Sequence, residues 1–218
     1  MIDFFSDKLK TPYPWPKYSQ VIVNDFVVGA MENTSATIHD FYTVYQTKED
    51  IIDGRNGETA IAHELFHQWF GDLATPENWS NLALKESFAT YAEYLWLEHK
   101  YGRDAADAHH FMSKLKYLDE PEKNKVKIIR DGSVKNEEMF DVVSYDKGAQ
   151  VLHMLRKYLG DDLFFNSLKA YLEKYQFKNA NINDLLFVFE EVSGKELDWF
   201  FNEWWLAVVI PVLEISRE

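Results

Sequence analysis

Two histidines and a glutamate in one five-residue stretch are the residues of this sequence best suited to chemistry. The letters HELFH place His63 and His67 four residues apart, so in a helix both lie on one face, about one turn apart. Two imidazoles at that spacing can bind a single zinc ion. Glu64 follows His63 directly, which puts its carboxylate near such a metal without aiming it there. This position suits a general base that acts on a water molecule beside the metal.

A third ligand is needed, because a catalytic zinc ion takes three protein ligands and keeps one position open. Glu86 lies nineteen residues after His67, in a second stretch with a helical pattern. The short motif alone also occurs by chance, and two histidines on a helix can simply face solvent. The residues around them are apolar, however, and a buried charge without a partner is costly. We therefore predict that His63, His67 and Glu86 hold one Zn²⁺ ion per chain.

The elements that would position these residues follow from hydrophobic spacing and from breaker residues. Prolines within residues 12–16 favour an extended start, after which a buried strand is predicted over 19–28 and a second strand, near a sheet edge, over 29–41. Helical spacing predicts a helix over 58–71, ended by a glycine, and a long helix over about 82–101. Further helices are predicted over 104–118, 144–159, 161–175, 182–192 and 195–206. The histidines thus lie where a small strand-containing lobe meets a helical lobe.

Two other groups of residues do not indicate a site. The remaining five histidines match no ligand spacing, and we expect the adjacent His109 and His110 to face solvent. The tryptophan-rich segment 198–205 is expected to pack in the core or against another domain.

Composition narrows the class of protein. Hydrophobic residues make up 46% and charged residues 27% of the chain, as in ordinary soluble globular proteins. The net charge of −13 makes nucleic acid a poor partner. The absence of cysteine excludes disulfides, cysteine-ligated zinc and thiol catalysis. No apolar run of about 18 residues predicts a membrane span, and the first residues lack the pattern of a signal peptide. The compartment stays open, cytoplasmic or exported.

Three motifs, in order along the chain, resemble those of the gluzincin aminopeptidases, the aminopeptidase N family. The family pattern is HExxH, eighteen intervening residues and a glutamate, and residues 63–86 match this spacing. The stretch SYDKGAQVLHML matches another family motif, in which Tyr145 takes the place of the catalytic tyrosine. The family's Gly-Ala-Met-Glu-Asn motif stands complete upstream, as Gly29, Ala30, Met31, Glu32 and Asn33.

The resemblance extends over residues 4–206 and implies an α+β fold. This is the fold of a thermolysin-like zincin catalytic domain, with a small strand-containing N-terminal lobe and a mainly helical second lobe. Residues 1–206 would form this domain, with the break between the lobes near 72–80. The segment 207–218 is similar to the start of the family's next, all-β domain, or forms a tail. The family's N-terminal β domain and C-terminal helical domain are missing here and would be partners within a longer parent protein.

The same resemblance implies roles for the matched residues. Glu64 would take a proton from the attacking water, and the Tyr145 hydroxyl would stabilise the developing oxyanion. Glu32 would pair with the α-ammonium group of a peptide, while the backbone around it pairs with the peptide as an added strand. Metal-bound histidines usually donate their second ring nitrogen to a carboxylate or carbonyl. Glu93, on the same helix face as Glu86, is our hypothetical carboxylate partner, and a solvent-facing Glu93 is the alternative.

Three positions depart from the residues that are usual in the family. Asp72 stands where asparagine is common, Lys85 directly precedes the third ligand, and Ser87 replaces a frequent glycine. None of them is a predicted ligand or the base. These departures therefore concern helix packing and the surroundings of the ligands.

Taken together, the motifs favour a zinc-dependent aminopeptidase catalytic domain that acts on peptides with a free N-terminus. Two alternatives stay open. A thermolysin-type endopeptidase would use the same metal site, although the Gly-Ala-Met-Glu-Asn motif argues against it. A catalytically weak or silent metal-binding or interaction module would suit a chain without the neighbouring domains, although intact Glu64 and Tyr145 argue against such decay.

Overall fold

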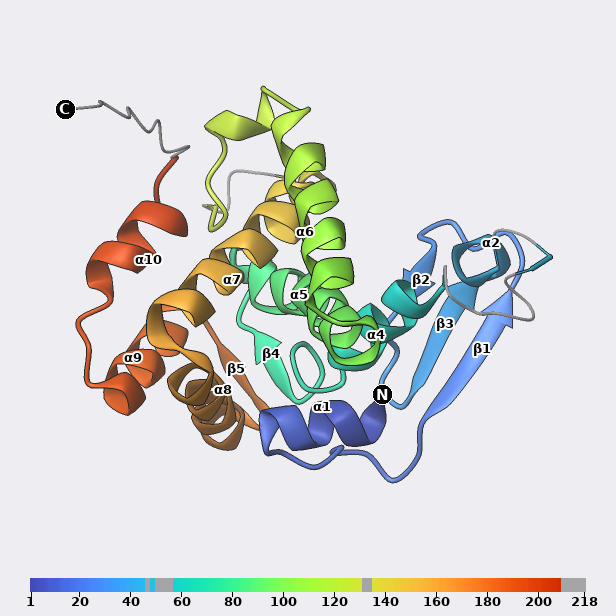
Figure 1. The fold of residues 1–218 in the computed structure, drawn as a ribbon, viewed down its shortest axis with the longest axis horizontal. Coiled ribbons are helices and arrows are strands. Elements are labelled where there is room, and N and C mark those ends of the chain that lie inside the picture. The colour runs from blue at the N-terminus through green and yellow to red at the C-terminus, as the bar shows by residue number, and fades with distance from the viewer. Residues whose placement is uncertain (46–47, 50–56, 131–134, 209–218) are drawn as a thin grey trace.

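The molecule has the predicted α+β architecture, with a small sheet at one end and a larger body of helices. The computed structural model describes residues 1–45, 48–49, 57–130 and 135–208 (Figure 1). The long helix α5 (Ala83–Tyr101) contacts α4 (Glu58–Phe66), α6 (Arg103–Leu118) and α7 (Gly148–Leu159). The helix that carries the predicted third ligand is therefore central to the helical body. The predicted α+β fold class is confirmed.

The small sheet contains three strands in the order β1-β3-β2. β1 (Ser19–Val23) runs parallel to β3 (Ala36–Asp40), while β2 (Ala30–Met31) is antiparallel to β3. The prediction of a single edge strand over 29–41 was wrong. A turn in which the backbone N–H of Ala36 donates to the carbonyl oxygen of Asn33 separates two strands, and β3 occupies the centre.

The prediction of a buried strand over 19–28 was also wrong. β1 ends at Val23, and because it pairs with β3 alone it forms an edge of the sheet. Its middle residues are exposed, and so are Val27 and Val28 beyond it, of which Val27 is 98% exposed. A run of valine and isoleucine is thus no proof of burial when neighbouring elements leave one side of the sheet uncovered.

The helical lobe follows the predicted helices closely. The bounds of α5, α6, α8 and α9 agree with the predictions to within one residue, whereas α4 is shorter and α10 begins later than predicted. The predicted helix over 144–159 begins as a π-helical turn, Val143–Lys147, that continues into α7. No helix was predicted where α1 (Ile2–Leu9) lies, and this helix buries Phe5 and Leu9. The remaining elements are α2 (Phe41–Val44), β4 (Ala74–Pro76), α8 (Asp161–Tyr175), β5 (Lys178–Ala180), α9 (Ile182–Ser193) and α10 (Asp198–Trp204).

Stacked aromatic rings hold the end of α4 against α5 and α8. The ring of Phe70 stacks on Phe88 at 4.5 Å and on Tyr171 at 5.9 Å between centroids. Trp69 is fully buried, and its indole N–H donates to backbone carbonyl oxygens of the segment after α1. Aromatic pairs of this kind contribute about 1 kcal/mol each beyond their buried area. The high aromatic content therefore fills a core directly beneath the predicted metal ligands.

α4 ends at Phe66, after which the chain continues in tighter turns: the N–H groups of Gln68 and Trp69 donate to the carbonyl oxygens of Leu65 and Phe66, three residues back. The N–H of Asp72 returns to the carbonyl oxygen of His67, and Gly71 adopts a φ of +137°, which favours glycine. A Cβ atom at Gly71 would lie 3.3 Å from both Nδ1 and the backbone oxygen of His67. The predicted end of the helix at 71 was thus too late, and Gly71 allows the chain to pass close to the imidazole.

Further expectations concern membrane-spanning helices, the limits of the domain and the tryptophan-rich segment. Within the part of the chain that the structure describes, no helix has both the length and the apolar character needed to cross a lipid bilayer. The predicted domain limit at 206 and the predicted lobe break near 72–80 stay predictions. The assignment of 207–218 also stays a prediction, because residues 209–218 lie outside the described residues. In the tryptophan-rich segment, Trp205 is buried, as expected for core packing, whereas Trp199 is 46% exposed and does not pack in the core.

Candidate active site

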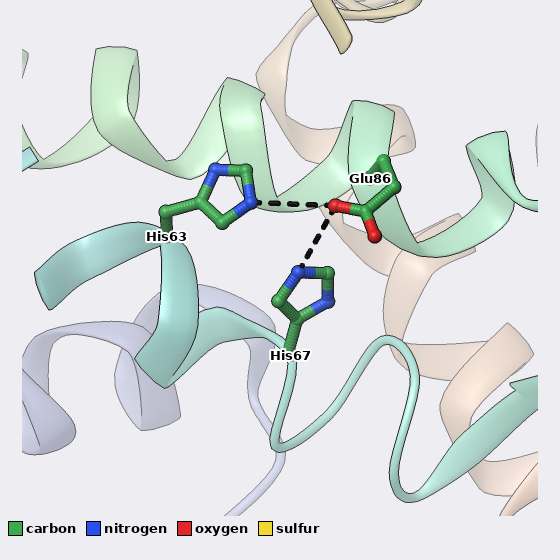
Figure 2. A group of neighbouring side chains, drawn as sticks. All are labelled: His63, His67 and Glu86. Atoms are coloured by element: carbon green, nitrogen blue, oxygen red, sulfur yellow. Dashed lines mark ion pairs between the residues drawn. The ribbon is translucent and has the colours of Figure 1, made fainter. Parts of the chain in front are cut away.

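The structure brings His63, His67 and Glu86 together at the junction of α4 and α5 (Figure 2). His63 lies in the last turn of α4, His67 directly follows that helix, and Glu86 lies in the first turn of α5. Nε2 of His63 is 3.4 Å, and Nε2 of His67 is 3.3 Å, from the same oxygen of Glu86, Oε2. All three side chains are largely buried, and the most exposed, His63, has 12% of its surface accessible.

These separations fit a tetrahedral zinc ion. Ligand atoms at about 2.0–2.1 Å from a metal at the centre of a tetrahedron are about 3.3 Å from one another. Both nitrogen-to-oxygen distances match this edge, and the three ligand atoms all lie within 4.8 Å of one another. Two imidazoles and one carboxylate form a donor set that zinc prefers. The residues present therefore fit a zinc ion.

The second ring nitrogen of each histidine has a partner that leaves Nε2 free for a metal. Nδ1 of His67 is 3.0 Å from the carbonyl oxygen of Phe70, which only accepts hydrogen bonds, so Nδ1 carries the proton. Nδ1 of His63 is 3.0 Å from Oε1 of Glu93, the residue that we expected as a carboxylate partner. Both contacts favour the tautomer whose Nε2 lone pair faces Glu86.

The charges of this cluster favour a cation between the ligands. Burial acts to raise the pKa of Glu86, but the charge of His67 and hydrogen bonds to both imidazoles outweigh it, and the pKa is lowered well below its usual value. Burial likewise acts to lower the pKa of His63, but the carboxylates of Glu86 and Glu93 raise it well above its usual value. The carboxylates around the two imidazoles therefore favour a positive charge between them. Protons on the imidazoles or a divalent cation can supply it, and with the cation each Nε2 keeps its lone pair for the metal.

A cavity of about 450 Å³ opens beside these ligands. Glu64 is buried in its wall, and its pKa is raised, first by burial and further by the carboxylates of Glu32 and Glu86. Glu32 and Glu64 also form a second, more carboxylate-rich cluster with His67. The cavity is lined by Val28, Ala30, Met31, Glu32, His63, Glu64, His67, Trp79, Lys85, Glu86, Phe140 and Tyr145.

Tyr145 enters this cavity from the π-helical turn that precedes α7. Its ring lies nearly parallel to the ring of His63, with centroids 5.9 Å apart. Burial and the carboxylate of Glu86 raise the pKa of Tyr145 above its usual value, so the hydroxyl keeps its proton and can donate it in a hydrogen bond. The turn comes close to α5 because position 148 is glycine, where a Cβ atom would lie 1.8 Å from Oγ of Ser87.

The Gly-Ala-Met-Glu-Asn segment forms another wall of the cavity, but only in part. Ala30, Met31 and Glu32 line the cavity. Gly29 and Asn33 do not line it. Instead, Gly29 has a φ of +79° and its carbonyl oxygen accepts from the N–H of Asp40, while Asn33 closes the turn before β3. These two residues therefore shape the loop rather than the cavity surface.

Sequence reasoning missed Gln68, which fixes this segment against α4. Its amide Nε2 donates to the carbonyl oxygen of Glu32 at 2.9 Å, and its Oε1 accepts from the N–H of Ser35 at 2.7 Å. The residue is fully buried. The available signal was its position beside His67 in a stretch of otherwise apolar residues, where a buried amide needs several partners.

The expectation that His109 and His110 face solvent was wrong. Nε2 of His109 is 3.0 Å from Oε2 of Glu93. His110 is half-buried, with its ring centroid 4.7 Å from that of His153, and burial lowers its pKa to about 3. Both histidines lie on α6, which packs along α5, and this packing leaves their side chains only partly exposed.

Curated relatives match nearly the whole of this chain. Aminopeptidase M1-C of Oryza sativa subsp. japonica is 34% identical over 222 residues, which cover 99% of this chain and 25% of that protein. Aminopeptidase N of Streptomyces lividans is 37% identical over 223 residues, with 99% and 26% covered. The chain thus spans about a quarter of the length of these curated relatives.

Solved structures and a family model point the same way. The M1 zinc metallopeptidase from Deinococcus radiodurans superposes with a TM-score of 0.76 and 28% identity over 97% of this chain and 44% of that one. A mutant of that protein, bound to a Tyr-Ser-Ala substrate, gives the same values. The model of the Peptidase family M1 domain matches residues 1–204. This chain therefore belongs to peptidase family M1.

Proposed function

We propose that the chain is the catalytic domain of a zinc-dependent aminopeptidase, which hydrolyses the N-terminal peptide bond of peptides. His63, His67 and Glu86 would hold the zinc ion. When bound, this ion would polarise the scissile carbonyl group and lower the pKa of a water molecule. The observation that carries the proposal is the convergence of both Nε2 atoms on Oε2 of Glu86 at the spacing of tetrahedral zinc ligands.

The other residues of the cavity divide the remaining chemistry. Glu64 would take a proton from the water that attacks the carbonyl carbon, and would return it to the amine nitrogen as the C–N bond breaks. The hydroxyl of Tyr145 would donate a hydrogen bond to the oxyanion that develops on the carbonyl oxygen. The raised pKa values of both groups support these roles, because the carboxyl then exchanges a proton more readily and the phenol remains a donor.

Glu32 would give the preference for a free N-terminus. Its carboxylate lies in the wall of the same cavity, and β2, which begins at Ala30, pairs with β3 on one side only. A peptide could therefore add to this strand with its α-ammonium group at Glu32. The names of the curated relatives, aminopeptidases, and the peptide bound to the Deinococcus radiodurans mutant support this substrate class.

One observation favours a second candidate function, a weak or silent metal-binding module. Nζ of Lys85 already lies 2.5 Å from Oε1 of Glu32, so this carboxylate is paired before an incoming ammonium group could reach it. Since the chain spans about a quarter of its relatives' length, further parts of a longer protein would also contribute to a full substrate site. A thermolysin-type endopeptidase would not need Glu32 at all.

The test combines metal analysis with hydrolysis of amino-acid p-nitroanilides by the wild-type chain and by Glu64→Gln. We expect about one zinc ion per chain in both proteins and a fall in kcat of about 10²–10⁴-fold in the variant. Equal cleavage by both proteins would overturn the role of Glu64. Bound zinc without cleavage in either would support the silent module, and cleavage of N-acetylated peptides would support an endopeptidase.

A further inference from the structure

Glu93 on α5 is held at both of its carboxylate oxygens by histidines from two different helices. Oε1 is 3.0 Å from Nδ1 of His63 on α4, and Oε2 is 3.0 Å from Nε2 of His109 on α6. The carboxylate is largely enclosed, with 17% of the side chain accessible. Three helices are therefore joined by one carboxylate next to the predicted zinc ligands.

The protons in the hydrogen bonds among His63, Glu93 and His109 have one consistent assignment. Each oxygen of the Glu93 carboxylate lies 3.0 Å from a histidine ring nitrogen, and an ionised carboxylate only accepts hydrogen bonds. Each histidine must then donate the proton of the nitrogen that faces it. For His63 this leaves Nε2 with its lone pair, and His109 completes the partners of the carboxylate from the other side.

We propose that His109 is a positioning residue for the metal site, holding Glu93 in the orientation in which it fixes the ring of His63. This inference rests on the proposed zinc site, and it adds α6 to the elements that shape that site. His109 does not touch the predicted ligands. It acts through Glu93 alone.

The surroundings of His109 explain why such a residue is needed. A second cavity of about 640 Å³ shares Tyr145 with the cavity beside the metal ligands, and Glu93 and His109 both line it. Charged groups of both signs, among them Lys116 and Asp146, line the same space. Without the N–H of His109, Oε2 of Glu93 would face this polar space, and water could draw the carboxylate away from His63.

The inference is tested by zinc affinity rather than by peptidase activity. The 218-residue chain and the variants His109→Phe and His109→Gln are titrated with zinc in competition with a chromophoric chelator. Phenylalanine keeps the ring shape without an N–H, and we expect about tenfold weaker binding, the lower end of the effect of losing an outer hydrogen-bond partner. Glutamine can place its amide Nε2 where the imidazole Nε2 lies, so it is expected to restore most of the affinity.

Met112→Ala is the matched control, because Met112 lies on the same helix and lines the same cavity. Unfolding midpoints of all variants separate loss of metal affinity from loss of folding. Wild-type affinity in His109→Phe, or equal losses in His109→Phe and His109→Gln, would overturn the positioning role. A wild-type chain that binds no zinc would instead overturn the proposed function itself.

Discussion

The ammonium nitrogen of Lys85 lies 2.5 Å from Oε1 of Glu32 and 3.2 Å from Oε1 of Glu86. One lysine thus bridges the carboxylate proposed to bind a substrate amine and a carboxylate proposed to bind the metal. Lys85 contacts Oε1 of Glu86, whereas the two imidazoles face the other oxygen, Oε2. Lys85, which the sequence marked only as an unusual residue, therefore lies at the centre of the site's electrostatics.

Lys85 would compete with the proposed substrate amine for Glu32, so its removal should strengthen substrate binding. For Lys85→Met, which keeps the side-chain length without the charge, we expect KM for amino-acid p-nitroanilides to fall up to about fivefold, equivalent to about 1 kcal/mol for a partly buried ion pair. Lys100→Met, which removes a lysine paired with Glu58 elsewhere, is the control. An increase in KM would show that Lys85 instead holds Glu32 in place for the substrate.

Tyr145→Phe should impair turnover while leaving the metal in place. The hydroxyl is proposed to donate to charge that exists only in the transition state, so kcat should fall about 10²–10³-fold with little change in KM. Zinc content should equal that of the wild type. Tyr158→Phe, at an exposed tyrosine of α7, serves as the control. A variant that retains wild-type kcat would exclude Tyr145 from the reaction.

Substitutions at Gly148 and Ser87 should have strongly coupled effects on the free energy of unfolding. A Cβ atom at position 148 would lie 1.8 Å from Oγ and 2.6 Å from Cβ of Ser87, so Gly148→Ala must displace α7 from α5. We expect the free energy of unfolding to drop by about 1–3 kcal/mol in urea titrations. The same change in a Ser87→Gly background should cost much less, because the obstructing atoms are gone. Equal costs in the two backgrounds would contradict this account.

Acid should destabilise the fold through His39, a fully buried residue of β3. Burial lowers the pKa of His39 to about 4. Below a pH of about 6.5, His39 is therefore protonated in the unfolded chain but not in the folded chain. The free energy of unfolding falls with pH until the pH reaches about 4. This residue alone should contribute a loss of about 2 kcal/mol between pH of about 7.5 and 5.

Chemical denaturation at the two pH values checks this expectation. His39→Leu removes the titrating ring and should show a smaller difference in unfolding free energy between the two conditions than the wild type. His99→Gln, at an exposed position, should keep the wild-type difference. Parallel pH dependence in the wild type and His39→Leu would assign the acid sensitivity to other groups.

The parts of the site that could be predicted are those fixed by local spacing. His63 and His67 lie one turn apart on any helix, and hydrophobic periodicity identified the helix that carries Glu86. Glu93 followed by the same reasoning, being on the same face of α5 as Glu86. The roles of these residues stay predictions, but their positions along their own helices needed no knowledge of how distant segments pack.

What could not be predicted depends on contacts between elements that are distant in sequence. Nothing in the local pattern of α6 indicates that His109 rather than His110 reaches Glu93, because that depends on how α6 lies along α5. The exposed Val27 and Val28 have the pattern of a buried strand, and only the absence of a covering layer in the described structure distinguishes them. The partnership of Lys85 with Glu32 likewise joins residues from opposite lobes.

The three predicted ligands all lie between the start of α4 and the first turn of α5, whereas Glu32 comes from a segment before them and Tyr145 from a segment after them in the chain. Metal binding would therefore need only the α4–α5 segment to be folded correctly, whereas turnover would also need the segments that carry Glu32 and Tyr145. Damage, truncation or loosening of the lobes should abolish activity first and leave a protein that still carries its metal. Zinc content alone would then be a misleading assay of whether a preparation is competent.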